Sequence, residues 1–258
     1  MSIFNKIQIA TLRCLSRRPS EGRYNGFSKK NIDHALDQLV AMYPGFLDQI
    51  KGKRVVDFGC GQGIQSMALA KAGAAHVVGV DINKEHLEMA RQEAKQMGLD
   101  NVTYCDGLGV NATGSFDWVI SHNSMEHFAE PYEVLCLFKK LIHKEGRIYI
   151  TFGPPWYSPY GAHMNFFTKV PWVHLFFSEK AVIAVRSNFT DDKATCYENV
   201  RGGLNRMTLS SFQRLLDRID CHIIYRKYVY MLNFSFLETV PLLKELCLYH
   251  INVILRKE

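Results

Sequence analysis

Three aspartates punctuate the first half of the chain at nearly regular intervals. Asp57, Asp81 and Asp106 each end a short apolar run, and they are 24 and 25 residues apart. Side chains that end successive strands of a parallel sheet face one crevice. One carboxylate there can accept hydrogen bonds from both hydroxyls of a ribose. A second can accept a hydrogen bond from an exocyclic amino group, and a third can bind an ammonium. The spacing therefore predicts a site for a nucleoside that also carries a cationic amino-acid part.

A glycine-rich turn follows the first of these strands, in the stretch VVDFGCGQG at 55–63. Gly59, Gly61 and Gly63 permit a tight turn and let backbone amides approach a ligand. The turn has no Lys or Arg, which argues against a phosphate-bearing ligand. The dinucleotide fingerprint Gly-x-Gly-x-x-Gly would need a glycine at Ser66, so an NAD-dependent oxidoreductase fits poorly.

A repeating order of strands and helices is needed to position these residues, and the hydrophobic pattern from residue 53 onward has that order. Strands are predicted at 53–57, 75–80, 102–105, 116–121, 147–152, 221–228 and 250–255. Helices are predicted at 64–72, 84–97, 132–141, 209–216 and 241–246. The sequence thus predicts an α/β fold: a Rossmann-like, doubly wound, mostly parallel sheet of seven strands.

The chain is expected to form one domain with four parts. Residues 1–50 form a basic, helical N-terminal arm and cap, and 51–153 form the ligand-binding core. Residues 154–206, rich in Pro, aromatics and His, form a lid after the fifth strand. Residues 207–258 complete the same sheet.

Four motifs together give the core a family resemblance: VVDFGCGQG, GVDIN at 79–83, YCDG at 104–107 and FDWVISHNSMEHF at 116–128. With them the stretch 50–152 resembles the class I S-adenosylmethionine-dependent methyltransferases, particularly the methyltransferase-11 type that acts on small molecules. The resemblance implies S-adenosylmethionine as cofactor and S-adenosylhomocysteine as its product. The implied cofactor contacts are Asp57, Gly59, Cys60, Gly61, Gly63, Asp81, Ile82, Asp106, Gly107, Ser121 and His122.

A further stretch, GPPWY at 153–157, is one residue away from the (Asp/Asn/Ser)-Pro-Pro-aromatic motif of methyltransferases that modify amino groups of DNA bases. In those enzymes the motif follows the fourth strand and its first residue accepts a hydrogen bond from the base. Here the stretch follows the fifth predicted strand, and Gly153 has no side-chain acceptor. We interpret the likeness as accidental and Pro154-Pro155 as a stiff exit into the lid.

Histidines near the ends of the fourth and fifth strands are candidates for the base that a hydroxyl acceptor requires. His163 is the first candidate and His122 the second, although each could be a structural histidine. No metal site is predicted, even though His122 and Glu126 are four residues apart. The expected acceptor contacts are Asn123, Glu126, His127, Trp156, Tyr157, Tyr160 and His163.

The charge is concentrated at the N-terminus. Residues 1–30 contain seven bases and one acid, whereas the other 228 residues contain 24 of each. Ile3, Phe4, Ile7, Leu12 and Leu15 could form an apolar helical stripe there. This arm is either a helix packed on the domain or, through residues 1–18, a peripheral contact with an anionic membrane surface. The other 228 residues have no net formal charge, which argues against nucleic acid as a partner.

The cysteines and apolar runs bear on the compartment. Seven cysteines without a Cys-x-x-Cys pair predict free thiols in a reducing cytoplasm and no zinc site built from cysteine. The basic arm at residues 1–18 adds the alternative of a peripheral location at the inner face of a membrane. No apolar run approaches the roughly 20 residues of a bilayer span. The sequence leaves the oligomeric state open.

The predicted function is methyl transfer from S-adenosylmethionine to a small molecule, foremost O-methylation of a sugar, glycan, lipid head group or natural product. Three alternatives stay open: N-methylation of a small amine, methylation of nucleic acid or protein, and binding of the cofactor without catalysis.

Overall fold

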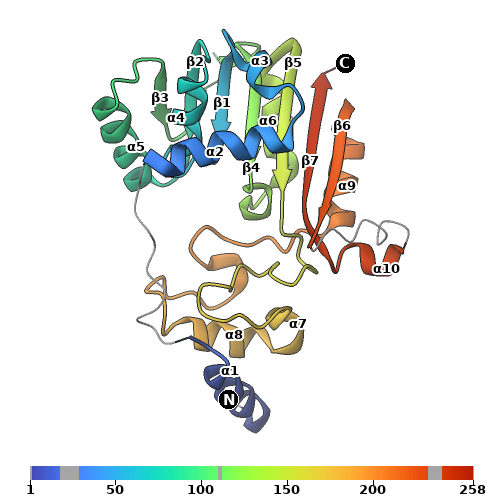
Figure 1. Cartoon of the computed structure of the whole chain (residues 1–258). Helices are drawn as coiled ribbons and strands as arrows, with labels where there is room; N and C mark the ends of the chain where they lie inside the picture. The colour runs from blue at the N-terminus through green and yellow to red at the C-terminus, as the bar shows by residue number, and fades with distance from the viewer. Residues whose placement is uncertain (1, 18–28, 110–111, 232–239, 258) are drawn as a thin grey trace.

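The computed structural model describes residues 2–17, 29–109, 112–231 and 240–257, and a seven-stranded sheet forms its centre (Figure 1). The strand order is β3-β2-β1-β4-β5-β7-β6, so it reverses between β1 and β4. The strands are β1 (Arg54–Phe58), β2 (His76–Val80), β3 (Val102–Cys105), β4 (Phe116–His122), β5 (Ile142–Phe152), β6 (Cys221–Tyr230) and β7 (Leu248–Lys257). The predicted doubly wound α/β fold is confirmed.

The first five strands run parallel, and β7 pairs antiparallel with both β5 and β6. The register joins Phe58 to Val80 and Val80 to Cys105, so β1, β2 and β3 end at the same edge. The inner strands are apolar without alternation because helices cover both faces of a parallel sheet. The three aspartates of the sequence pattern are thereby brought to one edge.

Helices cover the sheet on two sides, each with its own apolar cluster. On one side lie α2 (Lys29–Met42), α3 (Phe46–Ile50), α4 (Ile64–Lys71) and α5 (Lys84–Gln96). On the other side lie α6 (Pro131–Leu141) and α9 (Leu209–Arg218). The short α10 (Pro241–Lys244) precedes β7. The side chain of Asn83 caps α5 by accepting a hydrogen bond from the amide of His86.

The helices α2 and α3 are absent from the predicted elements. The buried residues of this segment are Ile32, Leu39, Tyr43, Phe46 and Ile50. The Tyr43 hydroxyl lies 2.9 Å from the Thr151 hydroxyl oxygen, which ties the segment to β5. These contacts place α2 beside the edge where β1 and β4 end.

A separate lid lies beyond the carboxyl ends of the parallel strands (Figure 1). It contains α7 (Val173–Phe176) and α8 (Glu179–Arg186), and α1 (Ile3–Cys14) packs on it. Its apolar cluster is formed by residues between 162 and 204 together with Ile9 and Leu12 of α1. The expected N-terminal arm is thus divided, because α1 packs on the lid whereas α2 and α3 pack on the sheet.

The expected apolar stripe of α1 is only partly buried. Leu12 is fully buried, whereas Ile3, Phe4 and Ile7 are 77%, 66% and 59% exposed. The basic residues Arg18, Arg23, Lys29 and Lys30, and the acid Glu21, lie outside the residues or side chains that the structure describes. No described helix has the length and apolar character that crossing a bilayer requires.

A short stretch of the lid, 203–205, fastens the lid to the turn after β4. The Asn205 side chain donates hydrogen bonds of 2.8 Å to the carbonyls of Met125 and Phe128, and its backbone amide donates to the Glu126 carbonyl at 2.9 Å. His127 donates from Nδ1 to the Gly203 carbonyl at 2.7 Å. These four bonds hold the two separately packed parts in register.

We expect Asn205→Ala to lower the free energy of unfolding by about 1–3 kcal/mol, because two part-buried carbonyls lose their donor. Urea denaturation followed by tryptophan fluorescence measures the change. Asn188→Ala is the matched control, since its side-chain amide donates only to the Val185 carbonyl within the lid. Equal shifts for the two variants would contradict the assigned role of Asn205.

Candidate active site

A cavity of about 240 Å³ opens at the carboxyl ends of β1 and β4, next to the reversal of the strand order. Ligands of doubly wound sheets bind at this position. Its walls come from β1 and its glycine turn, from α4, from the end of β4 and from α2. The lining residues are Ala35, Gln38, Asp57, Gly59, Cys60, Ile64, Gln65, His122 and Asn123.

The glycine turn needs glycine for two physical reasons. Gly59, Gly61 and Gly63 all have positive φ, which L side chains rarely adopt. A Cβ atom on Gly63 would lie 2.6 Å from the Tyr104 hydroxyl and 2.8 Å from Cβ of Ala90. The turn is therefore held tightly against the sheet and α5, with its open side toward the cavity.

Asp57 lies beneath this turn and is only 1% exposed. Its carboxylate accepts a hydrogen bond of 2.7 Å from Nε2 of Gln65 and one of 2.5 Å from the hydroxyl of Ser66. No described lysine, arginine or histidine forms an ion pair with it. Burial raises the pKa of Asp57 to about 6, so it is largely ionised at neutral pH and lacks a cationic partner.

Gln65 links Asp57 to His122. Because its Nε2 donates to Asp57, its Oε1 faces His122 and accepts a hydrogen bond of 2.9 Å from Nδ1. Nδ1 of His122 therefore carries the proton, and Nε2 keeps its lone pair. Burial lowers the pKa of His122 to about 4, so the imidazole is neutral at pH 7.

The other two aspartates lie at the same sheet edge but in more open positions. Asp81 accepts hydrogen bonds of 2.8 Å from the amides of Gly61 and Asn83, so it braces the glycine turn. Asp106 is 62% exposed and forms an ion pair of 3.7 Å with Lys84. Ile82 is 90% exposed, and Gly107 is also exposed. A ligand on this edge would extend from the cavity onto an open surface.

The turn after β4 carries three of the seven expected acceptor contacts: Asn123, Glu126 and His127. Asn123 lines the cavity and adopts a left-handed φ of 50°. Glu126 is 3% exposed, and Nε2 of His163 lies 3.8 Å from its Oε1. The rings of His127 and His163 are edge to face at 5.2 Å. Burial raises the pKa of Glu126 to about 8 and lowers that of His163 to about 4.

The expected base His163 is thus part of a cluster beside the cavity, while His122 lines the cavity itself. Ser121 is fully buried in β4 and is outside the cavity lining. The base and contact roles of these residues stay predictions, but the structure separates them into two groups with different surroundings.

The aromatic residues expected to touch the acceptor lie elsewhere. The Trp156 ring packs edge to face on His174 and Tyr197, with centroids 4.6 and 5.1 Å away. Tyr157 is 44% exposed, and neither it nor Tyr160 lines the cavity. The Trp156 side chain therefore packs against the apolar cluster of the lid.

The GPPWY stretch follows β5, as the sequence analysis expected. A Cβ atom on Gly153 would lie 2.4 Å from the carbonyl oxygen of Tyr249 and 2.7 Å from Cα of His250. Glycine is required there by the close approach of the first residues of β7. This packing requirement accounts for the glycine that distinguishes the stretch from the DNA-methyltransferase motif.

Four of the cavity-lining residues are absent from the sequence predictions: Ala35, Gln38, Ile64 and Gln65. Ile64 and Gln65 begin α4 directly after the glycine turn, and this position in the sequence was the available signal. Gln38 and Ala35 had none, because α2 precedes the first motif and reaches the cavity only through tertiary packing.

Comparisons with known proteins agree with this geometry. Residues 49–154 match a family model described as a methyltransferase domain. A ubiquinone biosynthesis O-methyltransferase of Neisseria meningitidis is 32% identical over 122 residues, which cover 46% of this chain and 51% of that protein. The chain thus matches about half the length of this relative.

Solved structures show the same fold over a longer range. A magnesium protoporphyrin IX methyltransferase from Synechocystis PCC 6803 with bound S-adenosylhomocysteine covers 99% of this chain and 96% of its own, with a TM-score of 0.54 and 18% identity. An S-adenosylmethionine-dependent methyltransferase from Mesorhizobium loti covers 88% of this chain and all of its own, with a TM-score of 0.56 and 18% identity.

Residues 49–154 thus match a methyltransferase domain, and the fold is that of solved S-adenosylmethionine-dependent methyltransferases. The site fits this cofactor on three observations. A buried, unneutralised carboxylate at Asp57 suits an ammonium, a glycine turn without cationic side chains suits a ligand without phosphate, and Asp81 and Asp106 lie along the same edge for the nucleoside. The cofactor assignment made from the sequence is confirmed.

We expect affinity for S-adenosylmethionine to rise with pH between about 5 and 7. Only ionised Asp57 attracts the ammonium, and its raised pKa of about 6 puts the change in that window. The dissociation constant should fall by up to about tenfold per pH unit below the pKa and level off above it. Calorimetric titration at several pH values measures this profile.

Asp57→Asn should weaken binding about ten- to hundredfold at pH 7.5 and flatten the pH profile. Asp33→Asn is the control, because Asp33 pairs with Lys71 on the surface. A profile in Asp57→Asn as steep as that of the parent protein would assign the pH dependence to another group.

Proposed function

We propose that this protein transfers the methyl group of S-adenosylmethionine to a hydroxyl of a small-molecule acceptor. The observation that carries the proposal is the cavity in which the cofactor residue Asp57 and the candidate base His122 share one hydrogen-bonded chain through Gln65. A base held in one tautomer beside the cofactor site is the arrangement that a hydroxyl acceptor requires.

When bound, S-adenosylmethionine supplies a methyl group that is already activated, so the protein has to align the acceptor, exclude water and receive a proton. His122 is suited to the last task because it is neutral at pH 7 and keeps the Nε2 lone pair. Asp57 and Gln65 fix its orientation. Asn123, next along the chain, adds an amide that can hold the acceptor.

The acceptor class rests on three considerations. More than half of the cavity-lining residues have polar side chains or are glycine, which suits a polar acceptor. The relatives that share the core are named as O-methyltransferases, which favours oxygen over nitrogen as the methylated atom. The family model ends at residue 154 and the relative matches 46% of this chain, so a sugar, glycan, lipid head group or natural product remains the range we propose.

A membrane-associated acceptor is compatible with α1. Its exposed Ile3, Phe4 and Ile7 lie on the lid side of the molecule, and Lys6 and Arg13 are on the same helix. An amphipathic helix of this kind can lie in a membrane interface. Peripheral membrane contact stays a prediction.

The function is tested by incubating the purified chain with S-adenosylmethionine labelled in its methyl group and a small-molecule extract, and identifying the labelled product. A labelled methyl ether is the expected result. Label on an amine, nucleic acid or protein would select one of the alternatives instead. Cofactor binding without any labelled product from extracts of several sources would indicate a non-catalytic protein.

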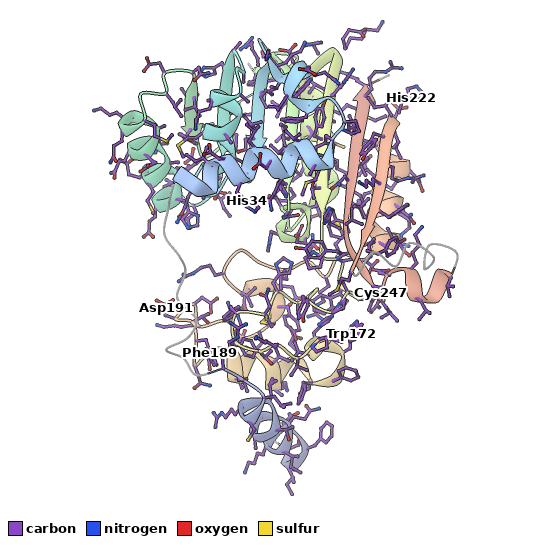
Figure 2. The ribbon with its side chains drawn as sticks, in the orientation of Figure 1. His34, Trp172, Phe189, Asp191, His222 and Cys247 are labelled. Atoms are coloured by element: carbon purple, nitrogen blue, oxygen red, sulfur yellow. The ribbon has the colours of Figure 1, made fainter. Side chains whose placement is uncertain are left out.

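Once an acceptor is known, His122→Asn should lower kcat about 10²–10⁴-fold, the usual contribution of general base catalysis, with little change in cofactor affinity. His222→Asn is the matched control, because His222 lies on β6 at the end of the sheet farthest from the lid (Figure 2). Steady-state kinetics and calorimetry measure both effects. Unchanged kcat in His122→Asn would remove His122 from the mechanism.

A further inference from the structure

Glu126, His127 and His163 form a cluster that the proposed reaction leaves unexplained. One potential metal-ligand atom of each residue lies within 4.8 Å of those of the other two. Glu126 and His127 belong to the short helix η3 (Met125–His127) after β4, and His163 comes from the lid. The core and the lid thus each contribute to one small polar centre.

The Glu126 carboxylate is the clearest sign that something is bound there. Its side chain is 96% buried, and neither carboxylate oxygen has a hydrogen-bond partner among the described residues. Buried polar groups are almost always paired, because leaving one unpaired costs free energy. Nε2 of His163 is also buried and unpartnered, and 3.8 Å is too long for a hydrogen bond to Glu126.

His127 is held in the orientation of a ligand. Since a carbonyl can only accept, Nδ1 of His127 carries the proton that it donates to Gly203, at 2.7 Å. The lone pair is then on Nε2. Histidines that bind metals typically donate their other ring N–H to a carbonyl or carboxylate in this way.

We propose that Glu126, His127 and His163 bind a divalent first-row transition-metal ion. One carboxylate and two imidazoles are a ligand set that such ions accept with positions left open, whereas Mg²⁺ and Ca²⁺ prefer oxygen ligands. Metal–ligand bonds of about 2.1 Å would place the Glu126 and His163 atoms 3.8 Å apart at an angle of about 130°. Small side-chain movements bring the third ligand into range.

The site adjoins the cavity through the turn that carries both Asn123 and Glu126. The ion, one carboxylate and two neutral imidazoles together carry one positive charge, which attracts an oxyanion. An open coordination position would hold the acceptor hydroxyl and lower its pKa. This role rests on the proposed function, whereas the binding of the ion does not.

No metal site is predicted from the sequence, although His122 and Glu126 are four residues apart there. In the structure His122 is hydrogen-bonded to Gln65, and the residues near the Glu126 carboxylate are His127 and His163. Glu126 and His127 are neighbours in the chain, and the lid brings His163 close to them.

Metal binding is tested on the full chain after removal of bound metals with a chelator, without cofactor or acceptor. Titration with Co²⁺, followed by its visible absorption and by calorimetry, should show one ion per chain and a raised midpoint of thermal unfolding. Zn²⁺ should displace it, and Mg²⁺ at the same concentration should not. Absence of Co²⁺ and Zn²⁺ binding, or stronger binding of Mg²⁺, would overturn the proposal.

Glu126→Gln and His163→Asn should each weaken Co²⁺ binding by about ten- to hundredfold. Glu88→Gln and His222→Asn, which lie on the surface, are the controls and should leave Co²⁺ binding unchanged. Calorimetry with S-adenosylmethionine checks that each variant retains its cofactor site. Unchanged Co²⁺ affinity in both cluster variants would overturn the assignment of the ligands.

The two proposals fail separately. Methyl transfer that persists at full rate after the ion is removed would overturn the role of the ion in the reaction and leave the proposed function standing. Co²⁺ binding that requires the cluster, together with no methyl transfer to any acceptor, would support the metal site and overturn the proposed function.

Discussion

The buried charge of Asp57 is the constraint on which the rest of the site depends. A carboxylate that is almost fully shielded from water must have its oxygens satisfied, and here Ser66 and Gln65 of α4 do this. Those two bonds fix where α4 begins relative to β1, and hence the path of the glycine turn between them. They also orient Gln65, which sets the tautomer of His122 at the end of β4. One unneutralised charge thereby organises three elements around the cavity.

A second constraint is the division of the molecule into separately packed parts. The sheet has an apolar cluster on each face, and the lid has one of its own. Within the lid, Arg186 and Asp192 form a buried, bidentate ion pair that secures the loop after α8. The junction with the core is polar, built from the hydrogen bonds of Asn205 and His127. Such a junction can hold a precise register without merging the clusters, and it brings His163 to the turn after β4.

The two groups of histidines illustrate how surroundings distinguish similar side chains. His122 ends β4 and His163 comes after β5, and burial lowers the pKa of each. His122 has a hydrogen-bonded partner in Gln65 and faces the cavity. His163 faces a buried carboxylate and a second imidazole. The first arrangement suits proton transfer, and the second suits coordination of a cation.

The sequence by itself determined the sheet and the cofactor edge. The strand at 75–80 and the helix at 84–97 have strong local signals, because an inner parallel strand is a nearly continuous apolar run and Asn83 caps the helix after this strand. The same local order brings Asp57, Asp81 and Asp106 to one edge. These features depend on neighbours in sequence or on the regular alternation of strands and helices.

Only the tertiary structure decided which side chains face the cavity and how the lid is placed. Gln38 of α2 reaches the cavity from a segment with no motif, whereas Trp156, in a motif-like stretch, packs within the lid. Such placements depend on packing between residues far apart in the chain. Hydrophobic periodicity records which face of an element is buried, but not which partner covers it.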